Sequence, residues 1–160
     1  ERPVYLFSNK PSDPALDIHD ITRPDMDESM YNDPLELESL RNSLVIFDDV
    51  EAVHDKKLAV ELDRVRDLIM QQGRSYHIDY IYVSHLANDY RRTKVVLNEC
   101  HSITIFPQMC SIYSLKYLLE KYFGFSKADI HKLHNLPSRW VTIFKAPITV
   151  LYETGAYLLI

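Results

Sequence analysis

Apolar runs separated by helical periodicity predict a chain in which strands and helices alternate. The clearest run, residues 43–47, is almost entirely apolar and stops at two carboxylates, Asp48 and Asp49. Such runs are typical of strands that are buried on both faces of a parallel sheet. Similar runs predict further core strands at residues 4–8, 78–83 and 103–106.

Helical periodicity is strongest over residues 55–72. The apolar positions of this segment recur on one face, and Gly73 follows where a helix C-cap belongs. Asp33 followed by Pro34 predicts a short helix that ends near Asn42, because Asp is a good N-cap and Pro suits the first helical position. The same reasoning predicts helices at residues 88–99, 111–123 and 126–136.

Two stretches depart from this alternation. Residues 9–33 are rich in Pro, Asp, Asn and Ser, which predicts a long surface excursion with a small strand near residues 18–22. The C-terminal part turns to strands, predicted at residues 140–144, 149–152 and 157–160. The order of elements predicts an α/β fold with a largely parallel central sheet flanked by helices, followed by a β-rich C-terminal meander.

Composition narrows the class of protein. With 46% hydrophobic and 26% charged residues, the 160-residue chain is globular, and neither disordered nor collagen-like. No apolar run approaches the roughly 18 residues that a membrane span needs, so no membrane span is expected. Two cysteines are too few for a disulfide framework, which indicates an intracellular reducing compartment. Cys100, His101 and Cys110 lack the paired spacing of a zinc site.

The net charge of −5 is unevenly distributed. Residues 1–50 carry 12 acidic and 4 basic side chains, whereas residues 51–160 carry 11 acidic and 14 basic ones. The acidic total excludes a protein that binds polyanions over its whole surface, but it leaves room for a local basic site in the second part.

The paired carboxylates are the main functional candidates. Ligands of open α/β sheets bind at the carboxyl ends of the strands, where this prediction places Asp48, Asp49, Ser84 and His85. An apolar strand that ends in two acids is the Walker B pattern of P-loop NTPases. There the first acid holds Mg²⁺, and the second orients or deprotonates the attacking water. A strand that ends in a solvated Asp-Asp turn is the alternative.

Three further features carry candidate chemistry. Arg74 could reach the γ-phosphate in a neighbouring subunit as an arginine finger, or it could only cap its own helix. Ser84 and His85 could sense phosphate or position water, or form an ordinary polar strand end. A serine hydrolase is excluded because no GxSxG elbow is present. A solvated helix face or a nucleic-acid phosphate contact would each explain Arg91, Arg92 and Lys94.

The chain contains no phosphate-binding loop. The motif GxxxxGK[ST] is absent, and the first glycine of the chain is Gly73. The strand at residues 4–8 is therefore expected to be the second element of a domain whose first strand, loop and helix lie outside this sequence. The chain is accordingly expected to be a fragment or a processed piece.

An ordered set of motifs resembles a known family. The set comprises Pro3–Ser8, Asp13–Asp17, Leu44–Asp49, Gly73-Arg74, Val83–His85, Thr93-Lys94, Leu97–Glu99 and Ser138–Val141. In this order the motifs are similar to those of the P-loop ATPases of large DNA viruses and related phage-like elements. These ATPases belong to the FtsK–HerA superfamily, as do the viral genome-packaging ATPases. The resemblance covers nearly the whole chain.

The resemblance implies roles, cofactors and partners. Asp48 would be the Mg²⁺-linked acid, Asp49 the catalytic carboxylate and Arg74 a finger that acts in trans. Ser84 or His85 would be the sensor, where cellular relatives carry Gln. The cofactors of the complete domain would be ATP and Mg²⁺. Members form homo-oligomeric rings that move double-stranded DNA. The implied partners are therefore DNA, further copies of the chain and capsid proteins. The implied location is the virion or the viral factory of the host cytoplasm.

On this basis residues 1–160 are expected to form a single incomplete P-loop NTPase-like domain. Its core sheet would occupy residues 1–110, and a helical pair with a β-rich extension would occupy residues 111–160. The expected function is that of a portion of a viral DNA-translocating, genome-packaging ATPase, inactive in isolation because the Walker A loop is missing.

Two other functions are alternatives to this ATPase. The first is a non-catalytic structural or virion-assembly protein derived from the same fold. The second is a metal-dependent nuclease built on Asp48 and Asp49. The nuclease is disfavoured because a two-metal site needs more carboxylates, and Glu51 and Glu99 are not obviously placed to supply them.

Overall fold

The computed structural model describes residues 2–17, 20–85 and 90–159. The chain divides into two compact units, residues 1–86 and residues 87–160. Each unit has its own sheet and its own hydrophobic core. The sequence-based division at residue 110 falls inside the second unit, and the expectation of a single incomplete domain stays a prediction.

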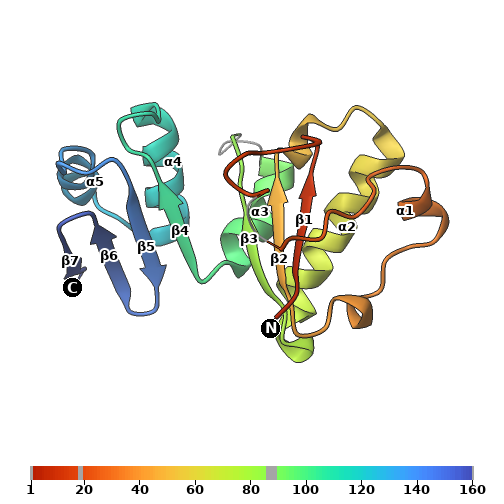
Figure 1. Ribbon diagram of the computed structural model, residues 1–160. Coiled ribbons are helices and arrows are strands. Elements are labelled where there is room, and N and C mark those ends of the chain that lie inside the picture. The colour runs from red at the N-terminus through yellow and green to blue at the C-terminus, as the bar shows by residue number, and fades with distance from the viewer. Residues whose placement is uncertain (1, 18–19, 86–89, 160) are drawn as a thin grey trace. The chain divides into compact units, whose positions relative to one another are not determined.

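The first unit contains a three-stranded parallel sheet in the order β1 (Val4–Ser8), β2 (Leu44–Asp48), β3 (Asp79–Tyr82) (Figure 1). The register aligns Ser8 with Asp48 and Phe47 with Tyr82, so the carboxyl ends of all three strands lie at one edge. The three strands predicted for this part of the chain, and their parallel arrangement, are confirmed.

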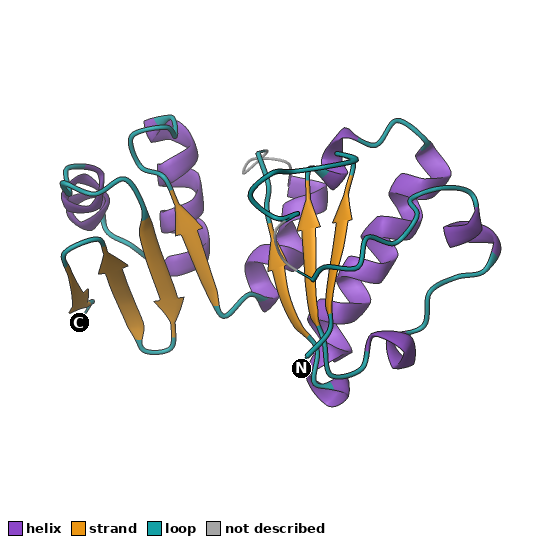
Figure 2. Cartoon of the chain, viewed as in Figure 1, coloured by secondary structure: helices purple, strands orange, loops and turns teal. Residues whose placement is uncertain are grey.

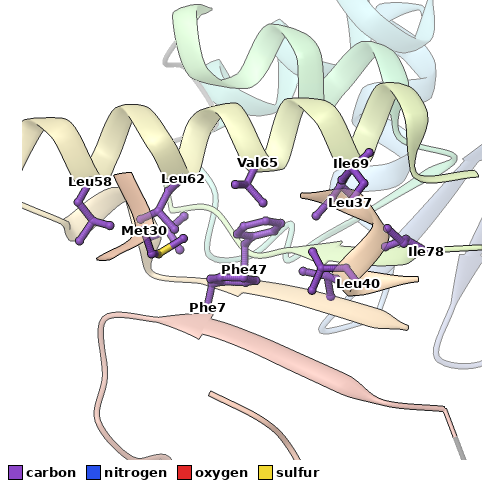
Figure 3. Close-up of a cluster of buried hydrophobic side chains, with 12 residues drawn as sticks. Phe7, Met30, Leu37, Leu40, Phe47, Leu58, Leu62, Val65, Ile69 and Ile78 are labelled. Atoms are coloured by element: carbon purple, nitrogen blue, oxygen red, sulfur yellow. The ribbon is translucent and has the colours of Figure 1, made fainter. Parts of the chain in front are cut away.

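The long helix α2 (Lys56–Gln72) covers one face of this sheet (Figure 3). Phe7 and Phe47 are fully buried beneath it, with ring centroids 5.2 Å apart and nearly parallel planes. The apolar face of α2 packs on these rings through Leu58, Leu62, Val65 and Ile69, as the helical periodicity predicts.

Local chemistry fixes both ends of α2. The Asp55 carboxylate accepts hydrogen bonds from the backbone N–H groups of Lys57 and Leu58 at 2.8 and 3.1 Å, which makes it an N-cap. Gly73 is the C-cap, but its φ of −54° is not left-handed. Glycine suits this position because a Cβ would lie 3.3 Å from Ile69 and 3.4 Å from Ile78.

The segment between β1 and β2 differs from the prediction. The helix expected from Asp33 to Asn42 is wrong: α1 (Ser29–Asn32) ends before Asp33, and only the 3-10 turn η1 (Leu37–Leu40) follows. Pro34 explains why α1 ends before Asp33, because the residue that precedes a proline is disfavoured in the helical region, and Asp33 has a ψ of 81°. After Pro34 only η1 forms, because a cap and a proline mark where a helix can begin but do not stabilise so short a segment.

The small strand expected near residues 18–22 is present as a single bridge. Thr22 pairs in parallel with Tyr5, and its backbone exchanges hydrogen bonds of 2.9 Å with Val4 and Leu6 of β1. Residues 18 and 19 lie outside the described residues. The bridge therefore covers part of the outer edge of β1 without forming a strand of its own.

The second unit contains a four-stranded antiparallel sheet in the order β4-β5-β6-β7 (Figure 2). The strands are β4 (Ser102–Ile105), β5 (Val141–Lys145), β6 (Ile148–Tyr152) and β7 (Gly155–Leu158). The unit also contains α3 (Tyr90–Glu99), α4 (Ile112–Phe123) and α5 (Lys127–His134). The predicted C-terminal meander is confirmed, and α4 and α5 bury their apolar residues against one face of the sheet.

The strand predicted at residues 103–106 does not join the parallel sheet. It forms β4, which pairs antiparallel with β5 and aligns Ile103 with Ile143. Ile105 is buried whereas Thr104 is exposed and bonds Thr142 through their hydroxyls at 2.8 Å. Such alternation is typical of an antiparallel sheet with one covered face. The alternation of polar and apolar residues in the sequence therefore indicates this kind of sheet for β4.

Across the described residues, every helix is too short or too polar to cross a membrane.

The Phe47 side chain should dominate the stability of the first unit. Phe47→Ala should lower the free energy of unfolding by about 3–5 kcal/mol, because a fully buried ring leaves a cavity between β2 and α2. Ile81→Ala is the matched control, since this side chain of the same sheet is 48% exposed and should cost less than about 1 kcal/mol. Urea denaturation of both variants measures the difference, and equal losses would contradict this placement of the core.

Candidate functional site

Four of the predicted site residues meet at the carboxyl edge of the parallel sheet. Asp48 is the last residue of β2, Asp49 follows it, and Ser84 and His85 come shortly after β3. His85 Nε2 lies 2.9 Å from Asp49 Oδ1. The parallel pairing of β2 with β3 thus brings together side chains that are 36 residues apart in sequence.

Asp49 occupies a left-handed turn. Its φ of 54° and ψ of 21° end the strand and start the 3-10 turn η2 (Val50–Ala52). Aspartate and asparagine tolerate this conformation better than most residues other than glycine. The turn reverses the chain at the sheet edge, where the Asp49 carboxylate meets groups that follow β1 and β3.

Lys10 pairs with both acids. Its Nζ lies 2.6 Å from Asp49 Oδ2 and 4.0 Å from Asp48 Oδ2. Ser8 supports this arrangement: its hydroxyl donates to Asp48 Oδ2 at 3.3 Å and accepts the backbone N–H of Lys10 at 3.2 Å. A cation that follows β1 therefore reduces the repulsion between two adjacent carboxylates.

Lys10 lowers the pKa of Asp49. The hydrogen bond from Lys10 lowers the pKa of Asp49 below its ordinary value, burial opposes the shift, and the charges of Lys10 and His85 add to it. The hydrogen bond to Asp49 in turn raises the pKa of Lys10. Asp49 is therefore an ionised, strongly hydrogen-bonded carboxylate at neutral pH, better suited to orienting a water than to storing its proton.

Glu51 forms a second cluster beside the first. Its Oε1 accepts hydrogen bonds from the Ser84 hydroxyl at 2.5 Å and the Tyr82 hydroxyl at 3.2 Å. Its Oε2 accepts the backbone N–H of His85 at 3.3 Å. One carboxylate thus ties the turn after β2 to the end of β3.

The environment of Tyr82 is mixed. Burial and then the nearby charge of Glu51 raise the pKa of Tyr82 to about 12. The Arg66 guanidinium of α2 lies over the Tyr82 ring, 5.6 Å from its centroid, and opposes this shift. Arg66 is itself almost fully buried and paired with Asp63 and Asp67 at 2.6 and 2.7 Å.

Arg74 does not join this group. It is exposed in the 3-10 turn η3 (Gly73–Tyr76), which precedes β3 and therefore lies at the amino edge of the sheet. Helix α2 runs from the carboxyl edge to the amino edge, a length of about 25 Å for 17 residues. Within the first unit, Arg74 and Asp49 are thus at opposite ends.

The basic residues predicted to contact nucleic acid belong to α3 of the second unit. Lys94 is exposed on this helix. Arg91 and Arg92 are part of the same helix, and their side chains lie outside the described part of the structure.

The second unit also contains a hollow of about 590 Å³. Its lining includes Phe106, Met109 and three residues of the motif at positions 138–141, namely Ser138, Arg139 and Trp140. Arg139 Nε bonds Glu153 Oε1 at 3.0 Å at this hollow.

Sequence reasoning missed Lys10 as a site residue and judged Glu51 not to be obviously placed. A signal existed for each. Lys10 comes two residues after the end of β1, and the carboxyl ends of neighbouring parallel strands must meet. Glu51 lies two residues beyond Asp49, so it follows the same strand end. Their exact partners depend on the left-handed turn at Asp49, which the sequence alone does not reveal.

The carboxylates offer the oxygen ligands that Mg²⁺ prefers. Within residues 2–17, 20–85 and 90–159, no group of three or more His, Cys, Asp and Glu side chains is arranged to hold a metal ion. Mg²⁺ nevertheless needs only one or two protein carboxylates when substrate phosphates and water complete its shell. Asp48 and Asp49 fit that limited role, with Lys10 as the competing cation.

The chain is similar to a viral protein. It is 32% identical over 157 residues to a Sputnik virophage protein described as uncharacterized protein V3. The match covers 96% of this chain and 63% of the virophage protein. The chain therefore spans less than two thirds of the length of this relative.

No protein-family model matches the chain. No solved structure matches it either.

Replacing Lys10 should move the titration of Asp49. In Lys10→Met the pKa of Asp49 should rise, because the strongest group that holds it down is removed. Since the folded pKa of Asp49 lies below the ordinary value of 3.8, the stability that this pair contributes is present above that value. It is lost as the pH falls through the folded pKa, so the variant and the wild type should converge in stability at low pH.

Carbon-13 NMR of the Asp49 carboxyl and urea denaturation across pH measure these two effects. Lys57→Met is the matched control, because Lys57 lies over the Tyr31 ring and not at the carboxylates. An unchanged Asp49 titration in Lys10→Met would show that the ion pair does not form in solution.

Proposed function

We propose that this chain is the portion of a viral DNA-translocating, genome-packaging ATPase that carries the Walker B acids, the sensor segment and the arginine finger. One observation carries the proposal: Asp48 and Asp49 end the central strand of a parallel sheet, with Lys10 and His85 converging on Asp49 from the neighbouring strand ends. The similarity to a virophage protein supports a viral setting.

In this proposal each residue of the sheet edge has a task. Asp48 would hold Mg²⁺, which supplies neutralisation of phosphate charge when it is bound. Asp49 would orient the attacking water through the lone pairs that remain on its two oxygens, one of which pairs with Lys10 and the other with His85. His85 and Lys10 hold Asp49 in its ionised form. A phosphate-binding loop, which this sequence lacks, has to be supplied by residues outside it.

Charge supports a DNA partner on the second unit. Residues 87–160 carry nine Lys and Arg against five Asp and Glu, a net charge of +4, and Lys94 is exposed there. Residues 1–86 carry nine bases against eighteen acids, a net charge of −9. In this proposal phosphates of double-stranded DNA contact the second unit, and copies of the chain form a ring.

The alternative is a non-catalytic structural or virion-assembly protein that keeps the sheet. The Lys10 ion pair favours it to this extent: an internal cation satisfies the two acids without any metal. The coding sequence upstream of Glu1 distinguishes the two functions. A GxxxxGK[ST] motif there supports the ATPase, and its absence from the natural protein supports the structural role.

The Asp49 carboxylate provides the direct test. In a longer form that carries the phosphate-binding loop, Asp49→Asn should retain ATP binding within about threefold but lose at least about 100-fold in turnover. Asparagine has a similar shape and tolerates the left-handed turn, so the loss reports on the charge of the carboxylate and on its orientation of the attacking water. Steady-state ATPase rates and calorimetric ATP titration measure the two quantities.

Asp25→Asn is the matched control, because Asp25 is an exposed aspartate of the same unit and should keep wild-type turnover. Turnover of Asp49→Asn within about threefold of wild type would exclude Asp49 as the catalytic carboxylate.

The position of Arg74 predicts that it acts on a neighbouring subunit. Its place at the amino edge keeps it from its own carboxylates, whereas an exposed guanidinium can reach outward. Arg74→Ala and Asp49→Asn subunits of the longer form should each be inactive alone. Mixed one to one, they should recover up to about a quarter of wild-type ATPase activity, because that share of interfaces joins an intact Asp49 to an intact Arg74.

Co-assembly of the two variants is verified by pull-down with distinct tags before the rates are compared. Two results would disprove the trans role: no recovered activity in verified mixed rings, or full activity of Arg74→Ala alone. Arg41→Ala is the control, since this arginine follows the 3-10 turn η1 and pairs with Glu38 of that turn.

A further inference from the structure

One carboxylate accepts hydrogen bonds from three groups at the end of β3. Glu51 accepts hydrogen bonds from Tyr82, Ser84 and the backbone of His85. Ser84 and His85 are exposed, so little packing holds this segment in place. The three donors lie within the four-residue segment Tyr82–His85, and Glu51 is the group on which all three converge.

The same segment supplies the histidine that reaches the candidate catalytic acid. His85 Nε2 is 2.9 Å from Asp49 Oδ1, while the backbone N–H of His85 is 3.3 Å from Glu51 Oε2. His85 is therefore tied through its main chain to Glu51 and through its side chain to Asp49. Glu51 and Asp49 are themselves separated by only one residue.

We infer that Glu51 is a positioning residue, which holds the segment Tyr82–His85 so that the His85 imidazole contacts Asp49. This inference rests on the proposed function, in which Asp49 acts on water, and it deepens that function by separating the two sensor candidates. His85 is the group that touches the catalytic carboxylate. The Ser84 hydroxyl instead donates to Glu51 at 2.5 Å. It is therefore part of the clamp, by which we mean the Glu51 carboxylate and the three groups that donate to it.

The chemistry of the acceptor fits this task. A carboxylate has two oxygens with several lone pairs, so it can accept three hydrogen bonds at once, which a neutral side chain does less well. The negative charge of Glu51 also contributes to the high pKa of Tyr82, which keeps that hydroxyl protonated and able to donate. The clamp is thus formed by one acceptor and three donors.

A double-mutant cycle on this chain tests the clamp without any need for turnover. Asp49→Asn should displace the His85 imidazole resonances in NMR spectra, which a His85→Gln variant assigns among the seven histidines. In a Glu51→Ala background the same Asp49→Asn change should displace them at least about threefold less, because His85 no longer stays at Asp49. A Glu38→Ala background is the control and should preserve the full displacement, since Glu38 pairs with Arg41 elsewhere.

Glu51→Gln serves if Glu51→Ala does not fold. It keeps the shape of the side chain but offers one acceptor oxygen in place of two, so the displacement should again fall. A displacement that persists at its wild-type size in a folded Glu51 variant overturns the inference.

The longer form with a phosphate-binding loop separates this inference from the proposed function. Glu51→Gln should lower kcat and leave the KM for ATP unchanged, because the clamp acts on Asp49 and not on nucleotide binding. A longer form without ATPase activity would refute the proposed function, whereas the NMR cycle on the present chain decides on the clamp by itself.

Discussion

The register of β2 between β1 and β3 is the constraint on which the candidate site depends. Val45 and Phe47 are fully buried beneath α2, and Asp48 faces the other way at the strand end. A slip of one residue would exchange the two faces of β2 and turn a carboxylate toward the aromatic core. The cost of burying that charge unpaired makes a one-residue slip strongly unfavourable, so the same packing that stabilises the unit also presents the acids.

The parallel arrangement then determines which groups can meet the acids. Residues that directly follow β1 and β3 are brought to the same edge, and these include Lys10 and His85. The left-handed turn at Asp49 completes the arrangement, because it lets one carboxylate accept from both neighbours. The order of the strands thus determines the charges around Asp49. Lys10 after β1 and His85 after β3 hold Asp49 ionised, and this limits its strength as a base.

Much of the fold could be predicted from local pattern, and the errors have physical causes. The strand that ends at Asp48, the helix capped by Asp55 and the C-terminal meander follow from apolar period and capping chemistry. The helix expected after Asp33 is replaced by the short turn η1, because a cap and a proline mark where a helix can begin but do not stabilise so short a segment. The prediction that β4 belongs to the parallel sheet is wrong, because a short apolar run does not indicate which strand it pairs with; β4 pairs with β5.

The site was predictable in its acids but not in its cations and clamps. Asp48 and Asp49 are adjacent in sequence, so the strand end alone indicates them. Lys10 and Glu51 act across strand ends, and their contacts depend on loop geometry that no periodicity encodes.

The net charge of the first unit affects which ligands can approach this site. An edge that is rich in acids, on a unit of net charge −9, repels a nucleoside triphosphate unless cations neutralise part of the charge. Lys10 is therefore significant in either proposed role. It is a cation of the chain itself that pairs with both acids, and it would compete with a bound metal for them.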